Sequence, residues 1–181
     1  GQKIHLLNFR ALIVLNMHNL VTQQAILKMV RYFHRDLKRI NHAFKVLGYA
    51  KTITEGEGLK ADTLQVIELA AILHDIGIPE SERKYQSSAP RYQEAEGPAI
   101  ARRILDECGA DEALTERVCF LVGHHHRYNK IDGIDFQILV ESDVLVNIQE
   151  GYIKPEAAPA VVRNYFRTNS GKELAASLYG L

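Results

Sequence analysis

The sequence predicts an all-α fold, a single bundle of helices, and three observations support this prediction. Apolar residues recur at three- and four-residue spacing along most of the chain, which is the period of an amphipathic helix. No segment alternates apolar and polar residues for long enough to indicate a strand. The length of 181 residues suits one domain with a sizeable core.

The first part of the chain predicts three helices. The apolar spacing indicates a helix from Val21 to Phe33 and a second one over residues 36–53. Asp62 and Gln65 then form a capping-box-like pair, which predicts the start of a third helix. The residues expected to face inward from the second helix are Leu37, Ile40, Phe44, Leu47 and Tyr49.

The segment after the third helix is polar. Residues 78–90 are predicted to form a loop of about a dozen residues, which is longer than most structural connections. Gly109 is expected to end the helix that follows, and Asp111 to open the next one. Helices are predicted over residues 91–108, 111–124 and 136–149, with a turn at 129–135 and two closing helices after Pro155 and Ser170.

The N-terminal segment is apolar-rich, but its longest uninterrupted run, residues 11–15, is too short for a membrane span or a secretion signal. Met17 is a candidate for the native first residue. The expected organisation is an N-terminal extension at 1–20 and one domain at 21–181, with core motifs at 37–150 and C-terminal helices at 155–181.

The composition limits the partners. Lys plus Arg and Asp plus Glu each number 22, so the formal net charge is zero. Without a basic excess, neither a nucleic acid polymer nor a membrane is the expected partner, and a small molecule is. Cys108 and Cys119 lack C-x-x-C spacing and fit a reducing, cytoplasmic environment. A homodimer is compatible with the sequence.

Several titratable side chains interrupt the apolar helix faces. His42 lies among apolar residues, the pair His74-Asp75 ends the apolar run AILHDIG, and Asp143 lies inside another apolar stretch. Taken singly, such a histidine more often bonds a carbonyl group, and such an aspartate caps a helix or pairs with Lys or Arg. Taken together, two imidazoles and two carboxylates from three helices can meet in a bundle core and hold a divalent ion.

These residues also carry a resemblance to a known family. The order of His42, His74-Asp75 and Asp143 resembles the HD superfamily of metal-dependent phosphohydrolases, which is named for the adjacent His-Asp. The resemblance covers roughly residues 37–150. The segment HAFKVLGYA is similar to the family's first helix, and ELAAILHDIG is similar to its second.

The resemblance implies an HD-domain helical bundle and an enzyme that cleaves a small phosphoester, such as a nucleotide, with a metal-activated water. Asp75 would act as the catalytic carboxylate, by orienting the attacking water or by bridging to a second ion. One ion (Zn, Fe, Mn, Co, Ni or Mg) is expected rather than two. The implied metal ligands are His42, His74, Asp75 and Asp143.

One departure from the family bears on the number of ions. Binuclear members carry a further histidine where this chain has Gln93. In the segment LVGHHHRY, consecutive helical residues point about 100° apart, so at most two of the three histidines can converge; His126 is expected to be the more exposed one. The candidates for a second metal or for substrate are His124, His125, Gln93, Glu94 and Glu96.

Phosphate binding also requires cations, and Lys84, Arg91 and Arg39 are the candidates because they flank the predicted site. Two alternatives stay open: an HD-type di-iron oxygenase, and a catalytically silent domain that binds metal or nucleotide. A zinc protease is disfavoured because H-E-x-x-H is absent. The cyclic-dinucleotide phosphodiesterase branch is disfavoured because its Gly-Tyr-Pro signature is absent.

Overall fold

The computed structural model describes the backbone of residues 2–181 and the side chains of residues 18–181, so the predicted extension at 1–20 lies mostly outside the described side chains. Within the described backbone every regular element is a helix, which confirms the all-α prediction. The helices are α1 (Gln2–Phe33), α2 (Leu37–Gly56), α3 (Ala61–Leu73), α4 (Ile78–Tyr85), α5 (Pro90–Glu107), α6 (Glu112–Val122), η1 (Tyr128–Lys130), α7 (Ile134–Gln149), α8 (Ala158–Tyr165) and α9 (Asn169–Tyr179).

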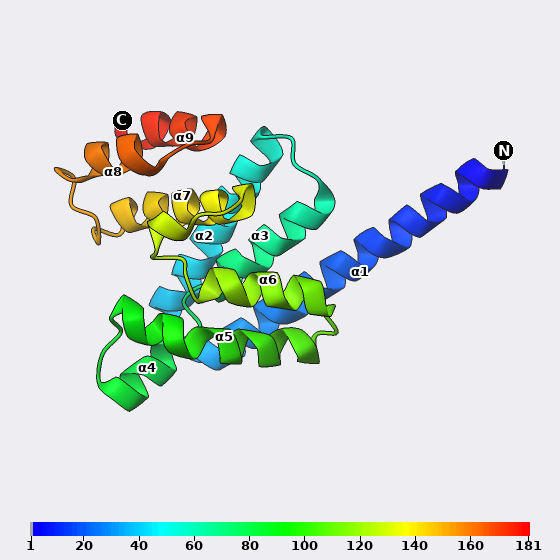
Figure 1. Ribbon diagram of the computed structural model, residues 1–181, viewed down its shortest axis with the longest axis horizontal. Coiled ribbons are helices and arrows are strands. Elements are labelled where there is room, and N and C mark those ends of the chain that lie inside the picture. Colours follow the sequence, from blue (N-terminus) through cyan, green and yellow to red (C-terminus); the bar gives the residue numbers. More distant parts are fainter. Residues whose placement is uncertain (1) are drawn as a thin grey trace.

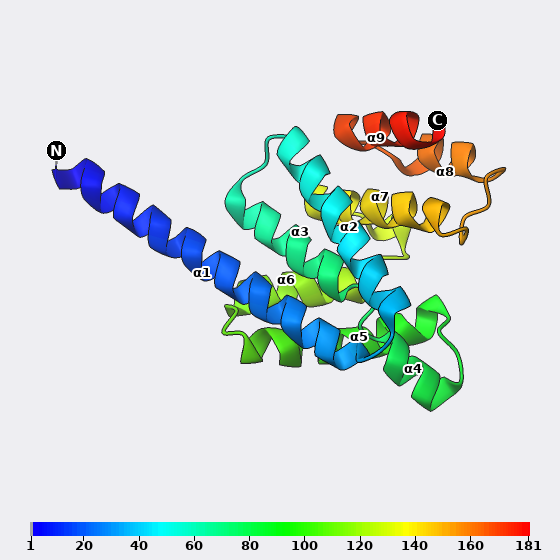
Figure 2. The same cartoon turned by 180° about the vertical axis from the view of Figure 1, so that it is seen from behind.

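Helix α3 is the centre of the bundle, because it contacts α1, α2, α6 and α7. Figures 1 and 2 show α8 and α9 at one end of the molecule, beside α7, and α4, α5 and α6 at the other end. Helix α2 packs on both α3 and α7, so these three helices form the middle layer.

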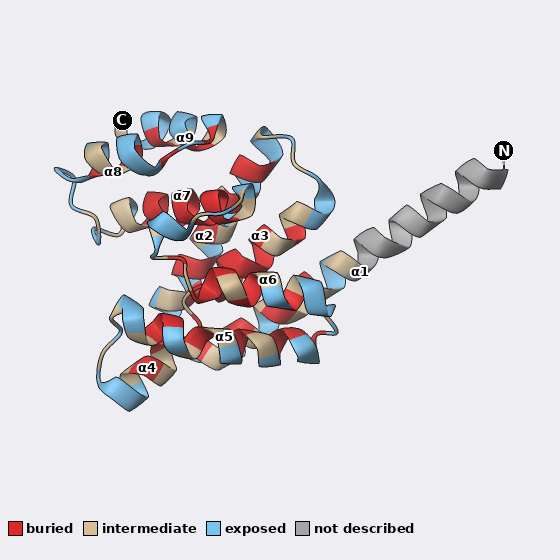
Figure 3. Ribbon diagram, in the orientation of Figure 1, coloured by how far each residue is buried: buried red, intermediate tan, exposed pale blue. Residues whose placement is uncertain are grey.

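Helices α3 and α7 are buried almost all round (Figure 3). In α3 every residue from Ile67 to Leu73 is buried, and in α7 every residue from Phe136 to Val146 is buried. A helix enclosed in this way needs apolar residues on all faces, so any charged residue within it requires a specific partner. Asp143 lies in the enclosed part of α7.

Several predicted helix ends are confirmed. Asp36 caps α2 by accepting a hydrogen bond from Arg39 N, and Asp111 caps α6 in the same way. Gly109 follows α5 with a positive φ of 73°, as a C-terminal glycine cap requires. The third helix differs from its prediction. Lys60 is its N-cap residue and Asp62 lies inside the first turn, without a side-chain cap bond.

The predicted loop at 78–90 was wrong for its first part, because residues 78–85 form α4. Pro79 suits the first turn of a helix, where the missing N–H is not needed. Glu80 pairs with Arg83 and Lys84 at three- and four-residue spacing, which stabilises an exposed helix. The prediction relied on the polar composition of this segment and did not consider ion pairs at helical spacing. The connection to α5 is therefore only residues 86–89.

Two residues of α2 predicted to face inward are exposed. The exposed fraction is 67% for Leu37 and 41% for Phe44. The inward face is formed mainly by smaller residues, among them Ala43 and Ala50, because α2 packs closely on both α3 and α7. His42 shares this buried face. None of the described helices is long and apolar enough to cross a membrane.

The turn after α3 packs directly on α5. A Cβ atom at Gly77 would lie 2.2 Å from the carbonyl oxygen of Gln93 and 2.7 Å from the backbone nitrogen of Gly97. Backbone atoms cannot rotate away as side chains can. Gly77 therefore sets how closely α5 approaches the His74-Asp75 turn.

We expect Gly77→Ala to lower the free energy of unfolding by about 1–3 kcal/mol, the usual cost of overpacking. Gly48→Ala is the matched control, because Gly48 is helical and its Cβ would meet nothing within 4 Å. That change should raise the free energy of unfolding by roughly 0.5–1 kcal/mol. Urea denaturation measures both, and equal effects of the two substitutions would contradict the close-packing argument.

Candidate metal centre

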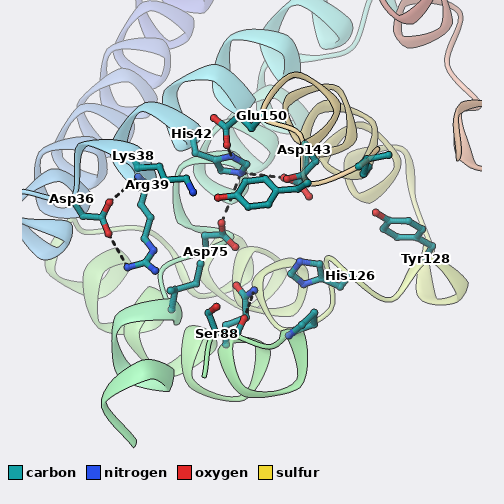
Figure 4. A pocket seen from close by; sticks show the side chains of 16 residues that line it. Asp36, Lys38, Arg39, His42, Asp75, Ser88, His126, Tyr128, Asp143 and Glu150 are labelled. Carbon is teal, nitrogen blue, oxygen red and sulfur yellow. Dashed lines mark hydrogen bonds and ion pairs between the residues drawn. The ribbon is translucent and has the colours of Figure 1, made fainter. Parts of the chain in front are cut away.

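Four side chains converge at the inner end of α3. His42 comes from α2, Asp143 from α7, and His74 and Asp75 from the corner between α3 and α4. Figure 4 shows His42, Asp75 and Asp143 directed toward one another. His42 Nε2 lies 3.2 Å from both His74 Nε2 and Asp143 Oδ1, and 3.8 Å from Asp75 Oδ2. All four residues predicted as metal ligands are thus brought together.

The corner itself results from the end of α3. The helix ends at Leu73, and α4 begins at Ile78, so only four residues make the turn. Ile76 N donates to Leu73 O, and Ile78 N donates to Asp75 O, each at 3.0 Å. These short-range bonds fix the backbone at the two ligand positions.

Hydrogen bonds at the opposite ring nitrogens orient the histidines. His74 Nδ1 donates to the backbone oxygen of Ala71 at 2.8 Å, and His42 Nδ1 donates to Glu150 Oε2 at 3.0 Å. A carbonyl oxygen can only accept, so the Nδ1 atom of His74 carries the proton. Its Nε2 atom is then left with a lone pair that points to the centre, as metal ligation requires.

The electrostatics of the centre favour a cation. Burial opposes a charge on His42, yet the carboxylates of Asp143, Asp75 and Glu150 raise the pKa of His42 to about 9. Burial alone would raise the pKa of Asp75, but the rings of His74, His125 and His42 hold it below its usual range. The carboxylates thus draw positive charge to the point where the four side chains meet.

The residues fit a divalent ion. Ligand bonds of about 2.0–2.2 Å place neighbouring donor atoms about 3–3.5 Å apart. Each of the two histidines lies 3.2–3.8 Å from the other and from a carboxylate oxygen of Asp75 and of Asp143. The donor atoms of His42, His74 and Asp75 all lie within 4.8 Å of one another. Lone pairs and carboxylate oxygens at such distances repel one another unless a positive charge lies between them. Two imidazoles and two carboxylates would suit a borderline or hard divalent ion.

A second group of donor atoms adjoins the first. Asp75 Oδ1 lies 3.6 Å from His125 Nε2, and donor atoms of Glu94, His125 and His126 lie within 4.8 Å of one another. Among the described residues, His125 Nε2 and His126 Nδ1 are buried without a hydrogen-bond partner. Glu94 is already engaged, because it accepts from His126 N at 3.1 Å and from Arg127 Nε at 2.9 Å.

The histidine run differs from its prediction. His125 and His126, rather than His124 and His125, face this second group. His124 stacks on Phe120 at 4.4 Å, and its Nδ1 donates to the Phe120 oxygen. The helical spacing used for the prediction does not apply, because α6 ends at Val122 and the three histidines lie in the turn that follows.

A cavity of about 450 Å³ opens onto the centre. Its wall includes the metal-ligand candidates His42, Asp75 and Asp143, together with the predicted residues Arg39 and Gln93. Gln93 Oε1 is buried without a partner within the described chain. The other residues that line the cavity are Asp36, Lys38, Ile78, Ser88, Pro90, His126, Tyr128, Asn147, Glu150, Tyr152 and Ile153.

The predicted site residues that do not line this cavity are His74, Lys84, Arg91, Glu94, Glu96, His124 and His125. Lys84 and Glu96 form an ion pair with each other at 2.7 Å, and Tyr85 also donates to Glu96. Arg91 lies over the ring of Tyr92 and donates to its hydroxyl group. The contacts of Lys84 and Tyr85 with Glu96 connect α4 to α5, whereas the contact of Arg91 with Tyr92 lies within α5. Of the three predicted phosphate-binding cations, Arg39 thus lies on the cavity wall, and Lys84 and Arg91 lie outside it.

Among the polar residues on the cavity wall that were not predicted from the sequence are Lys38, Asn147 and Glu150. Lys38 precedes Arg39 on α2, while Asn147 and Glu150 follow Asp143 on α7 by four and seven residues. Those spacings place the two α7 residues on the same helix face as Asp143. The helical period could have found both, once Asp143 was taken as a ligand.

Comparisons with known proteins agree with this geometry. The model of the HD domain family matches residues 39–160. A crystal structure described as a predicted HD superfamily hydrolase, from an uncultured Thermotogales bacterium, is similar to this chain. The TM-score is 0.58 and the sequence identity 25%, over 86% of this chain and 83% of that one. No curated protein matches significantly. The family model covers most of the chain, including all four converging side chains, and the chain belongs to the HD domain family.

Proposed function

We propose that the protein is a metal-dependent phosphohydrolase that cleaves a small phosphoester with a metal-activated water. The observation that carries this proposal is the convergence of His42, His74, Asp75 and Asp143 at one point, where all of them except His74 line the cavity. A divalent ion held there would lower the pKa of bound water toward ~7 and offset the charge of phosphoryl oxygens.

Asp75 is the residue best placed to act on the attacking water. Its Oδ2 atom faces His74 at 3.5 Å, and its Oδ1 atom faces His125 at 3.6 Å. The side chain also lines the cavity, so it can accept a hydrogen bond from a water molecule there. Its lowered pKa keeps the carboxylate ionised, as the acceptor role requires.

The cations of the cavity wall would bind the phosphate group. Arg39 donates to Asp36 and Glu82, which fix its guanidinium group at the rim. Lys38 is exposed, with its Nζ atom 4.8 Å from the centre of the Tyr152 ring. Planar guanidinium and mobile ammonium groups are both common ligands of phosphate.

The size of the cavity supports a small substrate such as a nucleotide, because ligand pockets for single small molecules span roughly 300–1,000 Å³. Polymer and membrane partners are not proposed, since the formal net charge is zero. We assign the activity to the cytoplasm, because Cys108 and Cys119 are both free thiols, as a reducing compartment requires.

A two-metal enzyme, such as a di-iron oxygenase, is the second candidate. It is favoured by the unpartnered Nε2 atom of His125, which lies beside Asp75. It is disfavoured by the ion pair between Glu94 and Arg127, which already supplies a positive charge to that carboxylate. Elemental analysis distinguishes the two: one ion per chain supports the phosphohydrolase, and two irons per chain support the oxygenase.

We expect Asp75→Ala to abolish metal binding and to lower kcat/KM for phosphoester hydrolysis by at least about 10³-fold, because it removes a ligand and the water's acceptor. Elemental analysis and assays on nucleoside monophosphates and small sugar phosphates measure both. Asp62→Ala is the control, since Asp62 is exposed in the first turn of α3, and it should change neither quantity. Full metal content and activity in Asp75→Ala protein would disprove the assignment.

We expect Lys38→Ala to raise KM by about 10-fold with little change in kcat, since loss of a hydrogen bond from a charged group weakens binding of substrate and transition state alike. Lys84→Ala should leave KM unchanged, because Lys84 pairs with Glu96 away from the cavity. Steady-state kinetics on the best substrate compares them. A larger effect for Lys84→Ala would restore the cation predicted from the sequence.

A further inference from the structure

A largely buried carboxylate contacts the first histidine of the metal centre. Glu150 is the C-cap residue of α7, and its Oε2 atom accepts from His42 Nδ1 at 3.0 Å. Its other oxygen, Oε1, pairs with Lys45 Nζ at 2.5 Å. Figure 4 shows Glu150 and Asp143 on different sides of the His42 ring. One ring nitrogen of His42 thus faces Glu150 and the other faces the centre.

Helix α2 and helix α7 each carry two of these groups on one face. On α2, Lys45 follows His42 by three residues, so the two side chains share a face. On α7, Glu150 follows Asp143 by seven residues, or two turns, and shares its face. Because α2 packs on α7, both pairs meet across one interface.

The position is an unfavourable one for a carboxylate. The C-terminal end of a helix carries a partial negative charge, which disfavours a carboxylate at this position. Its side chain is only 12% exposed. A negative group kept at such a position requires compensation, and Lys45 and His42 are the groups that supply it.

We infer that Glu150, held in place by Lys45, is a positioning residue that orients His42 for metal binding. The bond to Nδ1 fixes the ring and its proton, so that Nε2 presents its lone pair to the ion. This inference rests on the proposed metal centre, because it assigns a role to a residue outside the ligand set. Removal of such a partner typically weakens metal binding by about 10–100-fold.

The chain contains a matched control. Glu68 is a carboxylate of similar exposure, 11%, and it also pairs with a lysine of α2, Lys51, at 2.8 Å. Its second contact is the hydroxyl group of Thr22, at 3.4 Å, rather than a histidine. Glu150 and Glu68 therefore share burial and lysine pairing, and differ in their contact with the metal centre.

The test is the affinity for Co²⁺, measured by competition with a chromophoric chelator, in wild-type, Glu150→Ala, Glu150→Gln and Glu68→Ala protein. We expect Glu150→Ala to weaken binding by about 10–100-fold. Glu150→Gln should recover part of this loss, because its amide oxygen still accepts the Nδ1 proton. Glu68→Ala should change the affinity by less than about threefold. The visible spectrum of bound Co²⁺ should shift in Glu150→Ala alone, as a reoriented ligand changes the coordination geometry.

Three results would overturn the inference. An unchanged affinity in Glu150→Ala protein would show that His42 needs no support. Equal losses in Glu150→Gln and Glu150→Ala would assign the effect to charge rather than to positioning. Equal losses in Glu150→Ala and Glu68→Ala would assign it to general destabilisation.

Failure of the metal centre itself is a separate outcome. If wild-type protein bound no Co²⁺, the proposed function would fail, and positioning would be read from crystal structures of metal-free wild-type and Glu150→Ala protein. The inference predicts that the His42 ring turns or becomes disordered when Glu150 is removed. An unmoved ring would overturn it.

Discussion

The convergence of like-charged and electron-rich groups at one buried point is the constraint on which the structure depends. The ring nitrogens of His42 and His74 and a carboxylate oxygen of Asp143 lie 3.2–3.6 Å apart, so a proton or a metal ion has to lie among them. In a medium of low polarity such groups repel one another strongly. The fold has to supply both the rigidity that holds them and the positive charge that balances them.

Rigidity comes from the enclosed helices. Because α3 and α7 are buried almost all round, neither can rotate without losing apolar contacts on several sides. The contact of Gly77 with the backbone of α5 fixes the corner that carries His74 and Asp75. Farther along α7, the buried carboxylate of Glu141 accepts from the backbone nitrogens of Arg167 and Thr168 and ties the C-terminal helices to the same scaffold.

The sequence predicts the helical bundle and the four converging side chains for the same reason. Apolar periodicity defines which face of each helix is buried, and a histidine or aspartate on that face is conspicuous. Features without such a signal were predicted poorly. Helix α4 depends on pairs between exposed charges, and the inward face of α2 depends on the small volume of Ala43 and Ala50. Glu150 lies beyond the apolar stretch of α7, so only its seven-residue spacing from Asp143 could have indicated it, and its contact with His42 is seen in the structure alone.

The two sides of Asp75 differ in how their charge is balanced. On the side of His74, the carboxylates of Asp75 and Asp143 meet the imidazole rings of His42 and His74. No lysine or arginine among the described residues pairs with these two carboxylates, and they raise the pKa of His42 instead. On the side of His125, the neighbouring carboxylate of Glu94 already pairs with Arg127, the residue that follows His126. A fixed guanidinium group thus supplies positive charge on one side, whereas on the other side the positive charge comes from a proton on His42 or from a bound ion. This asymmetry supports a centre with one ion, and it is consistent with glutamine rather than histidine at position 93.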